Sequence, residues 1–224
     1  ITMKSLLAST LALSLLVTTS VFAKTQELPE VTEDGLHRVP DSKMAIVYAE
    51  PGAELSQYKR VNLLEAHVAF KKNWARDQRR NSVDPLRITP NDIEKIKASL
   101  AKEFHEVFRK TLEEGDYEIV DETGEDVLLV RPAIINLDVN APDTPRAGMS
   151  RTYTSSAGEM TLYIELYDSI TGDLIAKALD RRVDNANRSG FYTWTSSVTN
   201  RAAANRILKG WATILLDALN EAKK

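Results

Sequence analysis

The sequence predicts an α+β fold: a single domain with a mostly antiparallel β-sheet and two main helices packed on one face, in the order ββαββββα. Short segments between residues 44 and 183 alternate apolar and polar side chains, as strands do. Two longer stretches, 90–114 and 198–222, repeat apolar side chains every three or four residues, as amphipathic helices do. The chain of 224 residues is also long enough to bury one core without cross-links.

Residues 1–23 have the pattern of a cleaved signal peptide. Lys4 supplies a basic start, residues 6–17 are almost continuously apolar, and small residues end at Ala23. We therefore expect cleavage between Ala23 and Lys24. The alternative, a membrane anchor, needs about 20 consecutive apolar residues, and this run is shorter. The mature chain is predicted to contain no transmembrane helix.

The mature chain is expected to begin with a flexible leader over 24–43, which is polar, acidic and interrupted by prolines. The single domain then covers 44–224. Its first strand is predicted over 44–48, before a Pro-Gly turn. A period-two pattern over 59–70 predicts one continuous strand.

The first long helix has clear signals at both ends. Thr89 is a favourable N-cap, Pro90 suits the first helical position, and Asp92 can complete a capping box. Gly115 is the expected C-cap. The second long helix is expected to bury an apolar stripe made of Ala204, Ile207, Leu208, Trp211, Ile214, Leu215 and Leu219.

Four strands are predicted between the two helices. Residues 117–120 and 127–139 are expected to form a hairpin, and Pro132 predicts an edge or a bulge because proline has no N–H to donate. Residues 160–167 and 174–183 complete the set. The side chains expected to share one face of the second strand are Ala133, Ile135, Leu137 and Val139. Those expected to point outward from the third are Thr161, Tyr163, Glu165 and Tyr167.

Composition excludes several classes of function. The chain has no cysteine, which excludes disulfides, thiolate zinc sites, iron–sulfur clusters, thiol catalysis and a lipobox anchor. Its net charge of −3, from 29 basic and 32 acidic residues, gives no general attraction to nucleic acid, and none is expected as a partner.

The motifs of common catalytic sites are also missing from the sequence. The three histidines, His37, His67 and His105, have no metal-ligand spacing. There is no G-x-S-x-G elbow and no glycine-rich phosphate loop. The sequence therefore predicts no catalytic residue, no metal and no cofactor.

A basic segment is the most suggestive feature of the charge pattern. It contains Trp74 among the cations Lys71, Lys72, Arg76, Arg79 and Arg80. Such a segment suits an acidic partner protein or the anionic headgroups of a membrane; the alternative is a solvated connector. The acidic stretch 113–126 is interpreted as a solvent-facing helix end and turn, or as a charge partner of the basic segment within one chain or between copies.

The loops 140–157 and 183–197 are longer than this fold requires. The second combines amide, guanidinium and aromatic groups, which together suit the recognition of a sugar or a peptide. Alternatively, its aromatic rings pack the loop onto the core. The residues concerned are Asn185, Asn187, Arg188, Tyr192 and Trp194.

Three local patterns resemble one bacterial family. They are the segment from Tyr48 through Pro51-Gly52 to Val61, the segment from Gly158-Glu159 through Glu165–Gly172 to Asp180-Arg181-Arg182, and Trp211-Ala212 in the last helix. Together they resemble the exported envelope proteins, many of them lipoproteins, grouped as "domain of unknown function 3313". The resemblance covers roughly residues 35–220 and implies a fold and a location, but no catalytic residue.

These observations lead to three hypotheses. The first is a non-enzymatic accessory or binding module, periplasmic in a Gram-negative bacterium and peripheral to the outer membrane. Its partner would be an envelope protein or a second copy of the chain. The second is a periplasmic protein that binds a small ligand or a glycan. The third is a hydrolase with an unrecognised site, which a closed pocket holding His67 and a carboxylate would favour.

Overall fold

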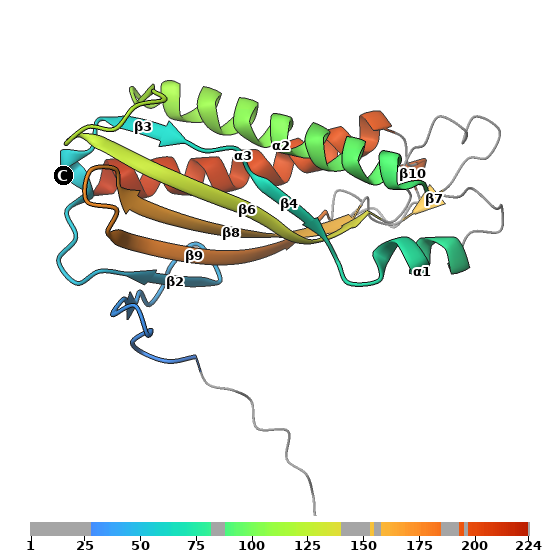
Figure 1. Ribbon diagram of the computed structural model, residues 1–224, viewed down its shortest axis with the longest axis horizontal. Helices are drawn as coiled ribbons and strands as arrows, with labels where there is room; N and C mark the ends of the chain where they lie inside the picture. The colour runs from blue at the N-terminus through green and yellow to red at the C-terminus, as the bar shows by residue number, and fades with distance from the viewer. Residues whose placement is uncertain are drawn as a thin grey trace, which may run out of the picture.

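The computed structural model describes residues 28–81, 88–139, 153–154, 158–184, 193–194 and 197–223. These residues form one open, eight-stranded sheet with two long helices along it (Figure 1). The predicted α+β fold is confirmed. No helix in the described part of the chain is long and apolar enough to span a membrane.

The sheet has the order β1-β2-β9-β8-β6-β3-β5, and β4 also pairs with β6. Pairs from β1 to β6 are antiparallel, whereas β3, β4 and β5 join in parallel. The strands are β1 (His37–Arg38), β2 (Ile46–Ala49), β3 (Arg60–Leu63), β4 (His67–Phe70), β5 (Glu118–Ile119), β6 (Val127–Val139), β8 (Gly158–Asp168) and β9 (Leu174–Val183). A separate antiparallel pair consists of β7 (Tyr153–Thr154) and β10 (Thr193–Trp194).

The helices are a short 3-10 turn η1 (Leu55–Gln57), then α1 (Trp74–Asn81), α2 (Pro90–Glu113) and α3 (Ser197–Glu221). The two long helices, α2 and α3, contact each other along the sheet, whereas α1 lies apart beyond the end of β4 (Figure 1). One continuous apolar core joins both long helices to the sheet, and it contains most of the predicted stripe of α3. The buried members of that stripe include Ile207, Leu208, Trp211, Leu215 and Leu219.

The signals at the start of α2 are confirmed. The Thr89 hydroxyl accepts a hydrogen bond from the Asp92 N–H, and the Asp92 carboxylate accepts one from the Thr89 N–H. The end of α2 differs by one residue, because Glu114 is the C-cap and Gly115 follows it. Gly115 lies close to α3 instead: a Cβ there would lie 2.1 Å from Cδ1 of Leu216, so that side chain would have to move.

The prediction of one continuous strand over 59–70 is wrong, because the structure divides this segment into β3 and β4. Both pair with β6, and the interruption lies opposite Pro132. The Leu64 N–H donates to the Val130 carbonyl, so the backbone groups of Val130 face the β3–β4 side. Because every second residue faces the same side, Pro132 also faces that side, where it has no N–H to offer.

The predicted hairpin of 117–120 with 127–139 is also wrong. β3 lies between β5 and β6 and pairs in parallel with both. The long strand also contains a bulge between Ile135 and Asp138, where Asn136 adopts a positive φ of 52°. The bulge reverses the alternation, so that Ile134 and Leu137 are both in the core, and the expected common face for 133–139 is not kept.

The expected flexible leader is structured over its described part, 28–43. β1 pairs with β2, and Leu36 is only 2% exposed. The Tyr48 hydroxyl donates to the Pro29 carbonyl at 2.8 Å, and Lys177 of β9 forms an ion pair with Asp34. These contacts hold the segment against one edge of the sheet, and burial of Leu36 offsets the entropy of ordering it.

Candidate functional site

The basic segment predicted from sequence contains a helix rather than a solvated connector. Trp74, the first residue of α1, is 3% exposed. Its ring stacks on Phe70 of β4, with centroids 4.0 Å apart, and its Nε1 donates to the Val139 carbonyl at 3.1 Å. Gln78 donates to the same carbonyl at 2.9 Å. These contacts fix α1 to the ends of β4 and β6.

Trp74 faces the sheet, whereas the side chains of Lys71, Lys72, Arg76 and Arg80 are exposed. Lys71 forms a 3.0 Å ion pair with Asp138, whose hydrogen bond raises the pKa of Lys71. Arg76 has a weak contact of 3.5 Å with its exposed neighbour Asp77.

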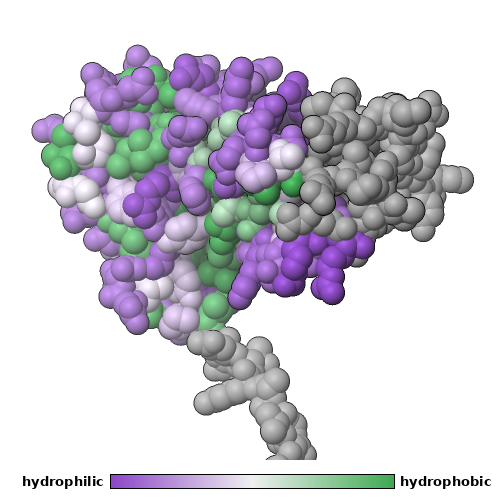
Figure 2. Space-filling view, turned by 45° about the vertical axis from the view of Figure 1, so that its right-hand side comes forward, coloured by the Kyte–Doolittle hydropathy of each residue, from purple (hydrophilic) through white to green (hydrophobic). Residues whose placement is uncertain are grey.

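Two further cations of the segment are unpaired. Lys72 and Arg80 are exposed and have no ion pair within the described residues. The backbone of Arg79 belongs to α1, and its side chain lies outside the described residues. Strongly hydrophilic residues gather on this side of the molecule, below the grey atoms in Figure 2. The structure therefore presents Arg76 and Arg80 on a helix that is fixed to the sheet, and Lys72 in the turn that precedes this helix.

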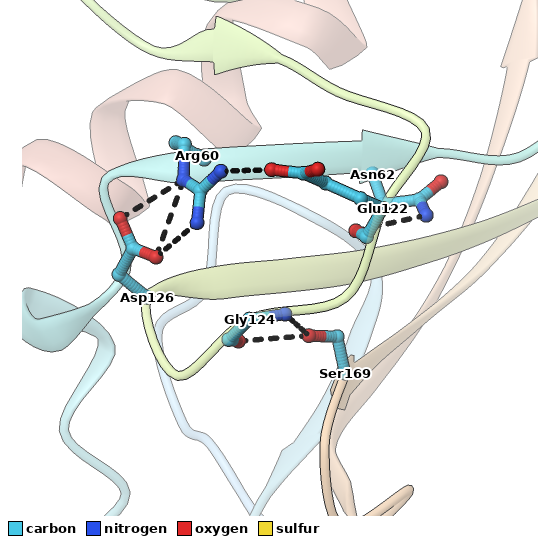
Figure 3. Close-up of polar contacts among 6 residues, drawn as sticks. All are labelled: Arg60, Asn62, Glu122, Gly124, Asp126 and Ser169. Carbon is cyan, nitrogen blue, oxygen red and sulfur yellow. Dashed lines mark hydrogen bonds and ion pairs between the residues drawn. The ribbon is translucent and has the colours of Figure 1, made fainter.

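The acidic stretch 113–126 is engaged within the chain, but by a different cation. Arg60 of β3 lies between Glu122 and Asp126, with 2.7 Å from its Nη2 to Oδ1 of Asp126 (Figure 3). Its hydrogen bonds hold the pKa of Asp126 below its usual value. The Ser169 hydroxyl accepts from the Gly124 N–H and donates to the Gly124 carbonyl, which ties this turn to the end of β8. The turn is thus joined to its own sheet.

The predicted ligand loop cannot be assembled from the described residues. Asn185, Asn187, Arg188 and Tyr192 lie outside them. Trp194 is placed only through its backbone, which pairs with Tyr153 in the β7–β10 ladder. The predicted cleavage site, Ala23 and Lys24, also lies outside the described residues.

Elsewhere, a buried carboxylate lies on the sheet face that carries no helix. Glu165 is 6% exposed, although the alternation of β8 points it outward. It accepts hydrogen bonds from Arg131 at 2.6 Å, Tyr163 at 2.5 Å and Tyr167 at 2.9 Å. Burial and the bond to Glu165 raise the pKa of both tyrosines, so both phenols stay protonated as donors. This cluster is fully paired and fastens β6 to β8.

The described residues hold no group of three or more histidine or carboxylate side chains placed to bind a metal ion. His67 is exposed at the start of β4. The closed pocket with His67 that would have favoured a hydrolase is therefore not formed by the residues seen here.

A family model described as "protein of unknown function (DUF3313)" matches residues 30–215. The chain belongs to this family. The resemblance inferred from the three sequence patterns is thus confirmed. No curated protein matches the DUF3313 chain.

Solved structures of low identity also match. A PelC dodecamer from Paraburkholderia phytofirmans is 14% identical with a TM-score of 0.39, and the match covers 76% of this chain and 96% of that one. A putative neuraminyllactose-binding hemagglutinin homologue from Helicobacter pylori is 12% identical with a TM-score of 0.33, covering 74% and 86%. A DUF4136 protein from Bacteroides thetaiotaomicron is 11% identical with a TM-score of 0.34, covering 75% and 95%. At these values no ligand, partner or activity is transferred to the DUF3313 chain.

Sequence reasoning identified the basic segment but missed the Glu165 cluster. The alternation of β8 placed Tyr163, Glu165 and Tyr167 on one face of one strand. The alternation could not predict that Arg131 joins this cluster, because Arg131 pairs with Glu165 across two strands and lies 34 residues away in the sequence. A lone acidic residue between two tyrosines on one strand face was the available signal.

Proposed function

We propose that this DUF3313 protein is an exported binding module of the Gram-negative cell envelope, which contacts an acidic partner protein through its basic segment and catalyses no reaction itself. The observation that carries the proposal is the burial of Trp74 beneath α1. A solvated connector needs no buried tryptophan, whereas a binding surface needs cations at fixed positions.

The charges of α1 support a partner of opposite sign. Lys72 and Arg80 have no ion pair within the described chain, and Arg76 meets only its own neighbour. Unpaired surface cations add little to folding stability. They do steer an acidic partner toward the surface and reject basic ones.

Export belongs to the same proposal. The proposed periplasmic location rests on the signal-peptide pattern of residues 1–23, and a position peripheral to the outer membrane is proposed with it. Fractionation of cells expressing the full chain, followed by sequencing of the N-terminus, tests it. We expect a periplasmic protein that begins at Lys24. A cytoplasmic protein that retains residues 1–23 would contradict it.

The partner is tested by reversible crosslinking in cells, with captured proteins identified by mass spectrometry. The test variant is Lys72→Glu with Arg80→Glu. The matched control is Lys95→Glu with Arg109→Glu, which reverses one exposed lysine and one exposed arginine of α2 that also lack an ion pair in the described chain. Circular dichroism and thermal unfolding check that both variants fold.

We expect an envelope protein with an acidic surface to be captured by the wild type and the control, and to be lost in the test variant. Reversing the matching acidic residues on that partner should restore capture. Equal capture by all three proteins would overturn the role of α1. Recovery of the chain with anionic lipid instead of protein would overturn the choice of partner.

A further inference from the structure

A groove of about 640 Å³, open to solvent, lies where α3 passes the C-terminal end of β9. It is distant in sequence from the basic segment, and its interpretation does not depend on the proposed function. Three of its lining residues are cations. The lining consists of Arg182 of β9 and, from α3, Asn205, Arg206, Lys209, Gly210, Thr213 and Ile214.

The side chain of Arg182 is held by contacts with Asp180 and Trp211. Its Nε donates to Oδ2 of Asp180 at 2.9 Å, and its guanidinium carbon lies 5.7 Å from the centre of the Trp211 ring. Asp180 is itself fixed in the interior. Its carboxylate accepts a hydrogen bond of 2.7 Å from Nε1 of Trp211 and one of 3.1 Å from the Ala45 N–H. Within the described residues, the two Nη groups of Arg182 have no hydrogen-bond partner. The guanidinium therefore keeps N–H donors on its Nη atoms that the described residues do not use.

Gly210 provides the space that this guanidinium occupies. A Cβ at that position would lie 2.4 Å from Nη1 of Arg182. Glycine inside a helix is less stable than alanine, so its presence in the middle of α3 needs a reason in packing. The close approach of Arg182 to the helix surface supplies that reason.

The other lining groups add donors that the chain does not use. Lys209 is exposed and has no ion pair in the described part of the chain. Arg206 uses one nitrogen for Asp184, at 2.7 Å.

We propose that this groove binds a phosphate-bearing ligand about the size of a sugar phosphate. A carboxylate is satisfied by one guanidinium fork, whereas a phosphate offers three oxygens. These can accept from the Nη groups of Arg182, from the donors of Arg206 that Asp184 does not use, and from Lys209, the cation of the three that has no ion pair in the described chain. The groove is larger than a phosphate alone and falls in the size range of small-molecule sites. Gly210, Thr213 and Ile214 remain to contact the uncharged body of the ligand.

Isothermal titration calorimetry on the folded protein tests the proposal with four probes. They are glucose 1-phosphate, inorganic phosphate, glucuronate and glucose. The variant is Lys209→Gln, which removes one exposed charge and should leave the fold intact. Its control is Lys95→Gln, an exposed lysine of α2. Arg182→Lys keeps the charge at the centre of the groove and removes the guanidinium fork.

We expect glucose 1-phosphate to bind best, inorganic phosphate more weakly, and glucose not at all. Lys209→Gln and Arg182→Lys should each weaken glucose 1-phosphate roughly tenfold, as the loss of a charge-assisted hydrogen bond implies. The control should bind as the wild type does.

Four results would overturn the proposal. One is the absence of phosphate binding at about 10 mM ligand, a concentration that detects even weak sites. Another is binding that is unchanged in both groove variants. Binding of glucuronate as tight as that of glucose 1-phosphate would overturn the preference for phosphate over carboxylate. Binding of inorganic phosphate without binding of glucose 1-phosphate would overturn the proposal that the ligand has the size of a sugar phosphate.

Discussion

The hydroxyl of Tyr58 donates a 2.9 Å hydrogen bond to Oδ2 of Asp168, across 110 residues of sequence. Tyr58 is 1% exposed and precedes β3, whereas Asp168 ends β8. Oδ1 of Asp168 accepts from the N–H groups of Ile170 and Thr171 at 2.8 and 2.9 Å. The bond from Thr171 above all, and then those from Tyr58 and Ile170, hold the pKa of Asp168 below its usual value.

This pair predicts part of the acid sensitivity of the fold. A carboxyl whose pKa is lowered by folding stabilises the protein above its unfolded pKa of about 4, and that stabilisation is lost as the pH falls through the folded value. In Tyr58→Phe, the pKa of Asp168 should rise toward its usual value. Urea unfolding at pH 7, 5 and 3 should then show a variant about 1 kcal/mol less stable at pH 7, which loses less free energy of unfolding on acidification. An unchanged pH dependence would contradict this assignment.

Replacing Trp74 should show how firmly α1 is attached. Trp74→Ala removes the stacking on Phe70 and the bond to Val139, and we expect a loss of about 3–5 kcal/mol in the free energy of unfolding. Trp74→Phe keeps an aromatic ring and loses the N–H donor, so it should lower the free energy of unfolding by less. The lost hydrogen bond should contribute on the order of 1 kcal/mol, in addition to the effect of the smaller side chain. Urea denaturation measures both variants. Equal costs for the two would mean that the stacking contributes nothing.

Replacing the buried Asp180 should lower the stability of the fold more than replacing most other polar residues. Asp180→Ala leaves the indole N–H of Trp211 and the guanidinium of Arg182 without their acceptor, and should cost about 3–5 kcal/mol. The matched surface change is Asp217→Ala, which breaks the exposed pair with Lys43 and should cost less than about 1 kcal/mol. Thermal unfolding compares the two. A cost for Asp180→Ala no larger than that for Asp217→Ala would be the contrary result.

Two glycines should respond differently to alanine. Gly158 has a φ of 153°, and a Cβ there would lie 2.1 Å from the carbonyl oxygen of Asp138. Gly172 has a φ of 75° with nothing within 4 Å of its Cβ position. Gly172→Ala should cost about 1 kcal/mol through backbone strain alone, and Gly158→Ala about 3 kcal/mol or more, because the backbone must also move. Urea unfolding of both variants decides whether the clash adds to the strain.

The helices were predictable because their signals are local. Thr89, Pro90 and Asp92 lie within four residues of one another, and their capping box formed as expected. The arrangement of the strands could not be predicted, because it depends on the register between segments that are distant in the sequence. β3 separates β5 from β6, although the two segments beside the acidic turn read as a hairpin.

The candidate sites divide in the same way. The positive charge of the basic segment was visible in the sequence, but the burial of Trp74 depends on Phe70 and Val139, which only the fold brings near. The groove was not predicted, because Arg182 and Lys209 belong to a strand and a helix that meet only in space. A glycine inside the amphipathic pattern of α3 was the one local signal for it.

The placement of β2 and β3 on opposite sides of the β6-β8-β9 meander affects how the chain folds. Val47 pairs with Ala178 and Val61 with Leu128, so neither early strand can join the meander until more than half of the chain has been synthesised. The meander closes through contacts of shorter range and is the natural nucleus. Sheets that depend on such distant pairings fold slowly. The N-terminal strands β2 and β3 are therefore expected to join the sheet after the meander has closed.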